Sequence, residues 1–325
     1  MFDLNDKTVL ITGGTGSFGN KFTEMVIKNF KPYKLIIFSR DEMKQYYMAQ
    51  KFSPDQYKFI RYFIGDIRDQ ERLYRAFHNV DIVIHAAALK IITSGEYNPI
   101  EVIKTNVIGA NNIINAAIDQ RVNKVLALST DKAVNPINLY GASKLAAEKL
   151  FIAANNYSGD SNTQFSCVRY GNVINSRGSV IPLWKEQAKT GKITLTDERM
   201  TRFFITLEKV ADFIFNILEM MKGREVFVPK MPSMKIIDLA KAIAPNAKIE
   251  FIGIRPGEKL NETLISEDEA HHTVEFDKGY IILPELEEDY NQYYYSKYKK
   301  VSERFKYSSD TNSWWINQKE ILQLI

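Results

Sequence analysis

The sequence predicts an α/β protein built on a doubly wound parallel sheet, followed by a smaller α/β domain. In the N-terminal half, short apolar runs rich in β-branched residues alternate with longer amphipathic runs, as strand–helix units do. The short runs are almost continuously apolar, which is typical of strands buried on both faces. After about residue 173, Gly, Pro and Arg interrupt this alternation. We therefore expect domains at 1–172 and 173–325, with the chain crossing back to the sheet near 205–230.

Each expected element follows from a local pattern. Six strands are expected, at 8–12, 34–38, 59–64, 81–85, 125–129 and 165–169. The first helix is predicted by Phe18, Phe22, Met25, Val26 and Phe30, which fall on one stripe at helical spacing. Further helices are expected at 96–120 and 140–156 and, in the second domain, at 208–221 and 236–244, with a strand at 226–228.

Composition and charge exclude several classes of protein. Hydrophobic residues make up 45% of the 325 residues and charged residues 25%, which are ordinary values for a globular protein. Lys and Arg (43) exceed Asp and Glu (39) by only 4, so the charge does not indicate nucleic-acid binding. A small excess suits an anionic small molecule that is bound locally. We expect small-molecule partners and no nucleic acid.

The single cysteine and the distribution of apolar residues indicate in which cell compartment the protein is expected. Cys167 cannot form an intrachain disulfide and leaves no Cys-rich metal site, so we expect neither a disulfide framework nor a bound metal. The first residues do not resemble a signal peptide, and no apolar run reaches the length of a membrane span. We therefore expect a soluble cytoplasmic protein without membrane contact.

A glycine-rich turn follows the first expected strand and opens the first helix. Gly13, Gly16 and Gly19 are spaced three apart, a variant of the dinucleotide fingerprint of Rossmann-type folds. Glycine allows positive φ and a close approach of the backbone to a pyrophosphate, which then lies at the helix N-terminus. The alternative is a tight turn without a ligand. The residues expected to bind the dinucleotide here are Gly13, Thr15, Gly16, Ser17, Phe18 and Gly19.

The end of the second expected strand indicates which dinucleotide binds. An NAD site normally has an acidic residue here for the ribose 2′-OH, but this chain has Ser39 and then Arg40, with Lys44 one helical turn beyond. Cations suit a 2′-phosphate, so NADP is favoured over NAD. Asp41 complicates this choice, and Arg40 can instead be an exposed residue at the start of a helix.

Two residues after the third expected strand are candidates for contact with the adenine. Asp66 can accept hydrogen bonds from the adenine amino group, and Ile67 can pack on the ring. The alternative is that Asp66 is the N-cap of the next helix, because Asp is a preferred residue at that position.

A tyrosine and a lysine after the fifth expected strand predict oxidation chemistry. Tyr140 and Lys144 are one helical turn apart, so both project from one face of a helix. We expect the Lys144 ammonium to lower the pKa of the Tyr140 phenol, so that it can act as a base near neutral pH. Such a base on a sugar hydroxyl, next to a nicotinamide, allows hydride removal from the same carbon. Thr130 can hydrogen-bond the same oxygen.

Taken together, these motifs resemble the extended short-chain dehydrogenases/reductases. More narrowly, the chain resembles the inverting UDP-N-acetylglucosamine 4,6-dehydratases (5-epimerising) of bacterial surface-polysaccharide and pseudaminic acid biosynthesis. The resemblance covers nearly the whole chain and rests on residues 12–19, 39–45, 85–90, 128–140, 169–173, 200–203 and 255–259. Its most specific part is the segment 129–133, which precedes Asn135-Pro136 and Tyr140.

The resemblance implies roles for Asp131 and Lys132 that an epimerase does not need. Oxidation at sugar carbon 4 acidifies the carbon 5 proton, so Lys132 can remove it while Asp131 protonates the hydroxyl that leaves carbon 6. Hydride then returns to carbon 6, and protonation of carbon 5 from the opposite face gives the L-configured 4-keto-6-deoxy sugar. A lysine base must be neutral, so we expect burial or the nearby Lys90 to depress the pKa of Lys132.

The resemblance also implies the remaining ligand contacts. Asn172 and Val173 are expected to hold the diphosphate, and Arg255 and Glu258 to bind phosphate and ribose. Further cofactor contacts are implied at Ala86, Ala87, Lys90, Leu128 and Ser129. The full set implied for the UDP-hexose substrate is Lys90, Thr130, Asn172, Val173, Arg177, Thr194, Met200, Arg202, Arg255 and Glu258. A tightly bound, recycled NADP and a homo-oligomer are implied as well.

Three departures from the family pattern keep the substrate open. The family has His and Pro where this chain has Ile91 and Thr93, and His where it has Asn261. These changes leave two alternatives to the dehydratase. One is another nucleotide-sugar epimerase or dehydratase. The other is a non-catalytic NADP-binding regulatory protein, which the intact set of Thr130, Asp131, Lys132, Tyr140 and Lys144 disfavours.

Overall fold

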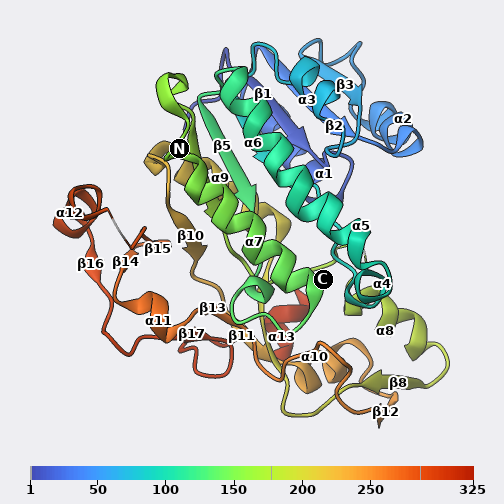
Figure 1. Ribbon diagram of the computed structural model, residues 1–325. Helices are drawn as coiled ribbons and strands as arrows, with labels where there is room; N and C mark the ends of the chain where they lie inside the picture. Colours follow the sequence, from blue (N-terminus) through green and yellow to red (C-terminus); the bar gives the residue numbers. More distant parts are fainter. Residues whose placement is uncertain (1, 177, 286) are drawn as a thin grey trace.

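One long sheet with helices on both faces is the frame of the computed structural model, which describes residues 2–176, 178–285 and 287–325 (Figure 1). Within these ranges seven strands run parallel in the order β3-β2-β1-β4-β5-β6-β10. They are β1 (Thr8–Thr12), β2 (Lys34–Ser39), β3 (Ile60–Ile64), β4 (Ile82–His85), β5 (Lys124–Leu128), β6 (Gln164–Val168) and β10 (Val226–Pro229). This is the Rossmann-type doubly wound sheet that the alternating pattern predicts.

Helices cover the two faces of the sheet in two sets. In Figure 1, α6 (Gly109–Asp119) and α7 (Leu139–Ala154) lie in front of the sheet, and α3 (Gln70–Ala76) packs against α6. On the other face α1 (Ser17–Asn29) packs against α9 (Leu207–Met220), where the rings of Phe22 and Phe215 lie 5.3 Å apart and are fully buried. All five residues of β1 are buried, because helices cover both faces of the sheet.

The single helix expected over 96–120 is interrupted in the structure. After α4 (Ile92–Tyr97), α5 (Pro99–Ile103) runs into a π-helical segment at Lys104–Ile108 and then into α6. The side-chain amide of Asn106, in this segment, accepts a hydrogen bond from Leu89 N (2.8 Å) and donates to Leu89 O (2.9 Å) and Ser143 Oγ (3.0 Å). Polar contacts to the loop after β4 therefore accompany the π turn, and apolar periodicity does not report such contacts.

A smaller region lies beyond the carboxyl ends of the parallel strands (lower part of Figure 1). Three small sheets form it: β7 (Asn172–Val173) with β9 (Thr201–Ile205) and β11 (Ser233–Lys235), β8 (Lys192–Leu195) with β12 (Lys248–Phe251), and β13 (Thr263–Ile265) with β17 (Tyr307–Ser308). Its helices are α8 (Val180–Ala188), α10 (Ile236–Ile243) and α13 (Gln318–Leu322). Trp184, Leu239 and Ile321 belong to its own buried cluster, separate from the core under the main sheet.

Two C-terminal segments return to the main sheet. Residues 205–230 form α9 and β10, and β10 pairs in parallel with β6. Residues 273–300 add β14 (Thr273–Phe276), β15 (Gly279–Ile282) and β16 (Lys299–Lys300) as an antiparallel edge, next to α11 (Glu267–Ala270) and α12 (Glu288–Lys297). Our division of the chain by sequence did not include this second return. Within the described ranges, no helix is both long enough and apolar enough to cross a bilayer.

Candidate active site

The glycine-rich turn between β1 and α1 lies close against the loop after β4. Gly13 has φ +64°, and a Cβ built on it would lie 2.9 Å from Ala87 N and Cα. A Cβ on Gly19 would lie 2.1 Å from Gly14 O, so the first turn of α1 also requires glycine. A side chain at position 13 would fill the space through which the backbone approaches Ala86 and Ala87. The turn thus has the steric character of a dinucleotide cradle.

A buried histidine that the sequence reasoning missed orders the same loop. His85, at the end of β4, shares a hydrogen bond of 2.8 Å between its Nδ1 and Thr12 Oγ1. Burial lowers the pKa of His85 to about 3, so the ring is neutral. Thr12 Oγ1 also accepts hydrogen bonds from Ala86 N and Ala87 N. Two strand ends thereby fix the loop that we expect to contact the cofactor.

The charged residues beyond β2 form a mixed cluster. Asp41 accepts a hydrogen bond from Lys44 N (2.9 Å) and caps α2 (Glu42–Lys51), and its carboxylate also pairs with Lys44 Nζ at 2.5 Å. Arg40 is more than half exposed, and its NH1 lies 3.9 Å from Asp66 Oδ2. Two cations are thus available for a phosphate at the end of β2. The neighbouring acids offset part of their charge.

Asp66 does not cap the next helix, so that alternative is wrong. Asp69 is the N-cap of α3 and accepts a hydrogen bond from Arg72 N (3.0 Å). Asp66 instead pairs with Arg68 at 2.7 Å; although burial acts to raise the pKa of Asp66, these hydrogen bonds hold it below its usual value. Ile67 is buried and lies against Gly109 of α6, so its contact with an adenine ring stays a prediction.

A compact acid–base cluster lies at the carboxyl end of β5. Thr130 Oγ1 donates to Asp131 Oδ1 (2.8 Å), and Lys132 Nζ donates to the same oxygen (3.0 Å). The three residues sit at the short 3-10 helix η2 (Asp131–Ala133), for which Thr130 is the N-cap. Asp131 is fully buried, and its Oδ2 has no hydrogen-bond partner among the described residues. One carboxylate oxygen is therefore left for a ligand.

Helix α7 brings Tyr140 and Lys144 to this cluster. Asn138 caps the helix by accepting a hydrogen bond from Gly141 N (2.7 Å). A Cβ on Gly141 would lie 2.2 Å from Lys132 O, so only glycine allows α7 to approach η2 this closely. Thr130 hydrogen-bonds the Tyr140 hydroxyl, and Lys144 Nζ donates to Leu128 O (2.7 Å).

The electrostatics of the cluster correct two expectations. Burial raises the pKa of Tyr140, although Lys132 and Thr130 act to lower it, so the expected lowering by Lys144 is wrong. Burial acts to lower the pKa of Lys132, but Asp131 and Glu262 outweigh it, and the pKa of Lys132 is well above its usual value rather than depressed. Lys90 does lie close enough to sense Lys132: burial and that charge lower the pKa of Lys90.

A loop from the smaller region closes on the start of α7. Asn138 Nδ2 donates to Gly257 O (2.8 Å), and Lys259 Nζ donates to Val134 O (2.6 Å). Arg255, in the same loop, is exposed, and Glu258 Oε2 is buried without a hydrogen-bond partner in the described ranges. An exposed cation and a buried carboxylate oxygen without a partner in the described ranges fit the phosphate and ribose contacts expected of Arg255 and Glu258.

The other residues expected to bind substrate have different surroundings. Asn172 and Val173 form β7, beside β9, and are half-buried. Arg202 is buried and donates to three carbonyls, Thr201 O, Leu260 O and Lys259 O, so it holds the loop rather than a free phosphate site. Met200 is buried in the core of the smaller region, and Thr194 is hydrogen-bonded to Gln187. Arg177 lies outside the described residues.

A second set of buried charged residues lies next to the cluster and is linked to it through Ser129. Ser129 Oγ donates to Glu148 Oε2 (2.8 Å), and Arg169 bridges Glu148 and Glu269 with contacts of 2.6 and 2.7 Å. Arg169 also donates to Leu264 O, so the network joins α7, β6 and the C-terminal part of the chain. Sequence reasoning missed these partners, because no spacing relates residues so far apart.

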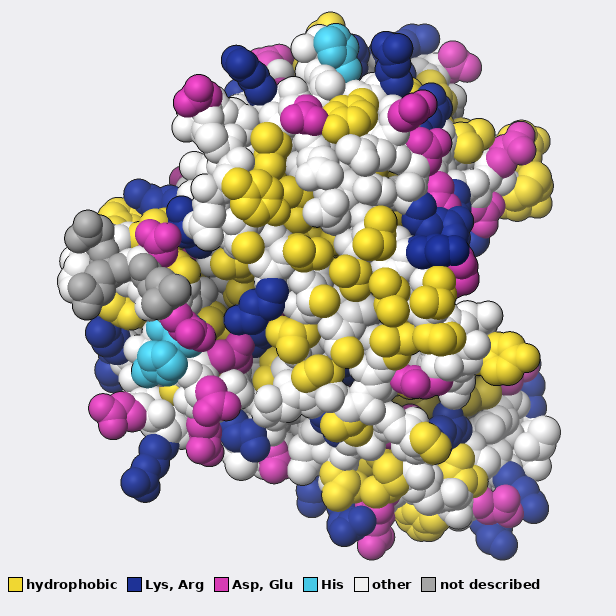
Figure 2. Space-filling view, in the orientation of Figure 1, with side chains coloured by type: hydrophobic (Ala, Val, Ile, Leu, Met, Phe, Trp, Pro, Cys, Tyr) yellow, Lys and Arg dark blue, Asp and Glu magenta, His cyan; other side chains and the backbone are white. Residues whose placement is uncertain are grey.

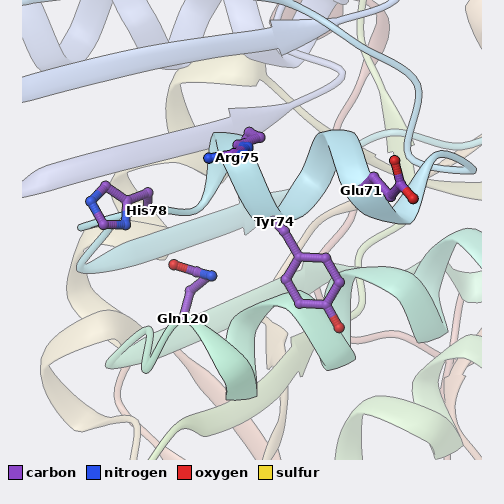
Figure 3. A pocket seen from close by; sticks show the side chains of 5 residues that line it. All are labelled: Glu71, Tyr74, Arg75, His78 and Gln120. Atoms are coloured by element: carbon purple, nitrogen blue, oxygen red, sulfur yellow. The ribbon is translucent and has the colours of Figure 1, made fainter.

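A surface hollow of about 380 Å³ is separate from this site (Figure 3). It is lined by Glu71, Tyr74 and Arg75 from α3, by His78, and by Gln120 after α6. His78 and Gln120 precede β4 and β5, so the hollow lies at the amino ends of these strands. Its position, opposite the edge where η2 and the glycine-rich turn lie, excludes it as the place of the chemistry.

The family model "Polysaccharide biosynthesis protein" matches residues 9–284. A UDP-N-acetylglucosamine 4,6-dehydratase (inverting) from Campylobacter jejuni is 51% identical over 99% of this chain and 98% of its own length. The chain belongs to the polysaccharide biosynthesis protein family. A UDP-glucose 4-epimerase from Rickettsia prowazekii is 43% identical over 98% of the chain and 95% of its own length.

Solved structures share the fold. The X-ray structure of Pen from Bacillus thuringiensis is 40% identical, with a TM-score of 0.90 over 100% of this chain and 99% of its own. DesIV from Streptomyces venezuelae, a dTDP-glucose 4,6-dehydratase with NAD and TYD bound, is 20% identical, with a TM-score of 0.70 over 78% of this chain and 86% of its own. The chain therefore has the Rossmann-type fold that these solved structures share.

Proposed function

We propose that this protein is an NADP-dependent, inverting UDP-N-acetylglucosamine 4,6-dehydratase. The observation that carries the proposal is the cluster at the end of β5. There an acid and a base, Asp131 and Lys132, lie 3.0 Å apart beside the Tyr140 hydroxyl and its partner Thr130. The 51% identity to the Campylobacter dehydratase supports it, because that relative is matched along nearly its full length.

The chain's own groups supply the proton transfers from oxidation at carbon 4 to the loss of water. Bound NADP would take hydride from sugar carbon 4 and return it to carbon 6. Tyr140 accepts the proton of the carbon 4 hydroxyl, and the Lys132 charge favours its phenolate against the effect of burial. Lys132, once it is a neutral amine, then removes the carbon 5 proton. Because Lys132 Nζ lies 3.0 Å from Asp131 Oδ1, this proton can pass to Asp131 and on to the leaving hydroxyl.

The donor set and the glycine turn fit a dinucleotide with a 2′-phosphate. Gly13 and Gly19 keep the turn open at the N-terminus of α1. Lys144 Nζ donates a hydrogen bond to Leu128 O at the end of β5. Arg40 and Lys44 provide cations at the end of β2, where NAD-specific sites present an acid. NADP is thus preferred to NAD in this proposal, with the tight binding that a recycled cofactor requires.

The substrate groups meet the cofactor groups at η2 and α7. We place the diphosphate of the UDP-sugar near Arg255, Asn172 and Val173, and its ribose at Glu258 Oε2. Lys90 lies near enough to Lys132 for the charge of Lys132 to lower its pKa, and we place it beside both ligands. Pseudaminic acid or another surface polysaccharide as the final product, and a cytoplasmic location, also belong to the proposal.

An exposed apolar face supports the proposed homo-oligomer. Figure 2 shows hydrophobic side chains gathered over the region of α6 and α7. On the neighbouring α5 and π-helical segment, Ile100, Ile103 and Ile108 are exposed. A contiguous face of this kind is typical of a protein–protein contact.

A 4-epimerase acting on UDP-glucose is the second candidate. The Rickettsia relative bears that name, and the departures at Ile91, Thr93 and Asn261 lie near the site: Ile91 is exposed, and Asn261 Oδ1 accepts a hydrogen bond from Thr201 (2.8 Å). An epimerase needs only Tyr140 and the return of hydride to carbon 4. The Asp131–Lys132 pair therefore favours the dehydratase.

One experiment separates these candidates. The protein is incubated with UDP-N-acetylglucosamine, and in parallel with UDP-glucose, in deuterated water, and the products are followed by NMR. We expect a 4-keto-6-deoxy sugar from the first substrate, with deuterium at carbon 5 and no net NADPH. Conversion of UDP-glucose to its 4-epimer without exchange at carbon 5 would identify an epimerase. Turnover of neither sugar would support the regulatory alternative.

A further inference from the structure

Glu262 is a buried carboxylate beside the proposed base. It is 2% exposed and lies between the loop that holds Lys259 and strand β13. Its backbone is anchored on both sides by the C-terminal segment: Glu262 N donates to Ser309 Oγ (3.0 Å), and Glu262 O accepts from Ser309 N (2.8 Å). This anchoring places its side chain at η2. The reaction outlined above assigns no role to Glu262.

The two carboxylates that face Lys132 differ in their hydrogen bonds. Asp131 Oδ1 accepts one from Thr130 and one from Lys132, at 2.8 and 3.0 Å. Glu262 Oε1 has only longer ion-pair contacts, 3.5 Å to Lys132 Nζ and 3.8 Å to Arg202 Nε. Its Oε2 has no hydrogen-bond partner in the part of the chain that the structure describes. Hydrogen bonds favour the ionised form of a carboxylate, and the described residues give none to the Glu262 side chain.

Lys132 needs an internal proton acceptor if it is to act as a base. Asp131 and Glu262 raise its pKa well above the usual value, so an isolated Lys132 would be cationic across the neutral range. Burial raises the pKa of Glu262, and the charge of Asp131 adds to this effect. A proton shared between the two side chains thus has a site on either one.

We propose that Glu262 takes a proton from the Lys132 ammonium and thereby leaves Lys132 as the neutral amine that attacks the carbon 5 proton. An N–H bond of Lys132 breaks and an O–H bond of Glu262 forms, with no change in the net charge of the pair. For this transfer the separation of 3.5 Å must shorten to hydrogen-bond distance in the loaded site. Glu262 acts through Lys132 and is therefore a positioning residue. The inference rests on the proposed dehydration.

Several other charged or titratable groups face this pair, and they bear on its pH dependence. Around Glu262 and Lys132 these groups are Asp131 on η2, Tyr140 on α7, Arg202 on β9, Lys259 in the loop, and Lys90 after β4. The charges of these groups change the pH at which the Lys132–Glu262 pair as a whole gains or loses a proton. Transfer within the pair conserves its net charge and its proton count, so the active form does not become rarer as the solution pH changes near neutrality.

Single-turnover kinetics of the NADP-loaded protein with UDP-N-acetylglucosamine test the proposal. The rise of NADPH absorbance reports oxidation at carbon 4, and its fall reports the later steps; a substrate deuterated at carbon 5 shows that the fall is limited by proton removal. We expect the wild-type fall to be nearly flat from about pH 6.5 to about pH 8.5. In Glu262→Gln the proton must leave to solvent, so the rate should rise about tenfold per pH unit.

Controls separate this role from a structural one. Glu262→Asp keeps a carboxylate and should keep the flat profile at a reduced rate. Glu186→Gln changes an exposed residue that pairs with Lys189 on α8 and should match wild type. Both variants and Glu262→Gln are checked for retained NADP and unchanged melting.

Two outcomes would overturn the proposal, and a third would overturn the proposed function on which it rests. A flat profile in a folded Glu262→Gln, at the wild-type rate, would mean that Asp131 alone holds the proton. A wild-type rate that itself climbs tenfold per pH unit would also exclude the transfer, even if Glu262→Gln failed to fold. If the wild type formed no NADPH and no keto sugar, the proposed function would fail first, and that result is distinct from both others.

Discussion

The two sides of the site are built in different ways. On the cofactor side, the main sheet holds a turn whose shape depends on missing side chains, at Gly13 and Gly19. On the substrate side, side chains tie loops together over long stretches of chain, as Asn138 ties Gly257 and Lys259 ties Val134. Local sterics thus define one side, and distant hydrogen bonds define the other. Substitutions should damage the two sides in separable ways.

The largest effect is expected where the two sides meet. Lys132→Ala removes the proposed base at carbon 5, so exchange of that proton in deuterated water should fall by about a thousandfold or more. Binding of NADP and of the UDP-sugar, measured by calorimetry, should be retained, because neither ligand depends mainly on this side chain. Exchange at the wild-type rate in Lys132→Ala would remove Lys132 from its role.

The next effect concerns the cofactor side alone. Gly13→Ala places an alanine where the backbone φ is positive, which costs on the order of 1–3 kcal/mol. Its Cβ would also lie only 2.9 Å from Ala87 N. We expect a lower melting temperature and loss of bound NADP during purification. Gly159→Ala is the matched control: its φ is +53°, but a Cβ there meets nothing within 4 Å among the described residues. Equal loss of NADP in both variants would contradict the cradle.

A smaller effect is expected on the substrate side. Asn138→Asp keeps the oxygen that caps α7 but loses the donor to Gly257 O, so KM for the UDP-sugar should rise while NADP affinity stays the same. Asn138→Ala also loses the cap, which costs about 1 kcal/mol of stability. Unchanged KM in a folded Asn138→Asp would show that the loop is held by other contacts.

The smallest effect on turnover is expected from the buried network of Glu148, Arg169 and Glu269. Its contribution should instead be visible in how the melting temperature depends on pH. Burial acts to raise the pKa of Glu269, but Arg169 lowers it below the usual 4.5. The pair therefore stabilises the fold above that value, and this contribution is lost as the pH falls through the lowered pKa. Between about pH 5 and about pH 3, melting should fall more steeply in wild type than in Glu269→Gln. Parallel curves would show that the pair contributes no such linkage.

The same contrast explains what the sequence could predict. The strands at 8–12 and 124–128, the glycine-rich turn and the pair Tyr140–Lys144 depend on local spacing, and the expected and observed elements agree within a residue or so. The interruption at Lys104–Ile108 and the anchoring of Arg202 depend on contacts between residues far apart in sequence. The expected pKa directions of Tyr140 and Lys132 were wrong. Burial, which the local sequence does not report, raises the pKa of Tyr140, and the adjacent Asp131, together with the distant Glu262, raises that of Lys132.

Gly141 acts as a spacer between two kinds of chemistry. Its missing side chain lets the carbonyl of Lys132 approach the first turn of α7, and a Cβ there would lie 2.2 Å from that oxygen. Any larger residue must move the acid–base pair away from the phenol. In the proposed reaction, oxidation at carbon 4 depends on Tyr140, whereas elimination also depends on Asp131 and Lys132. The close approach at Gly141 therefore sets the distance between the phenol and the acid–base pair.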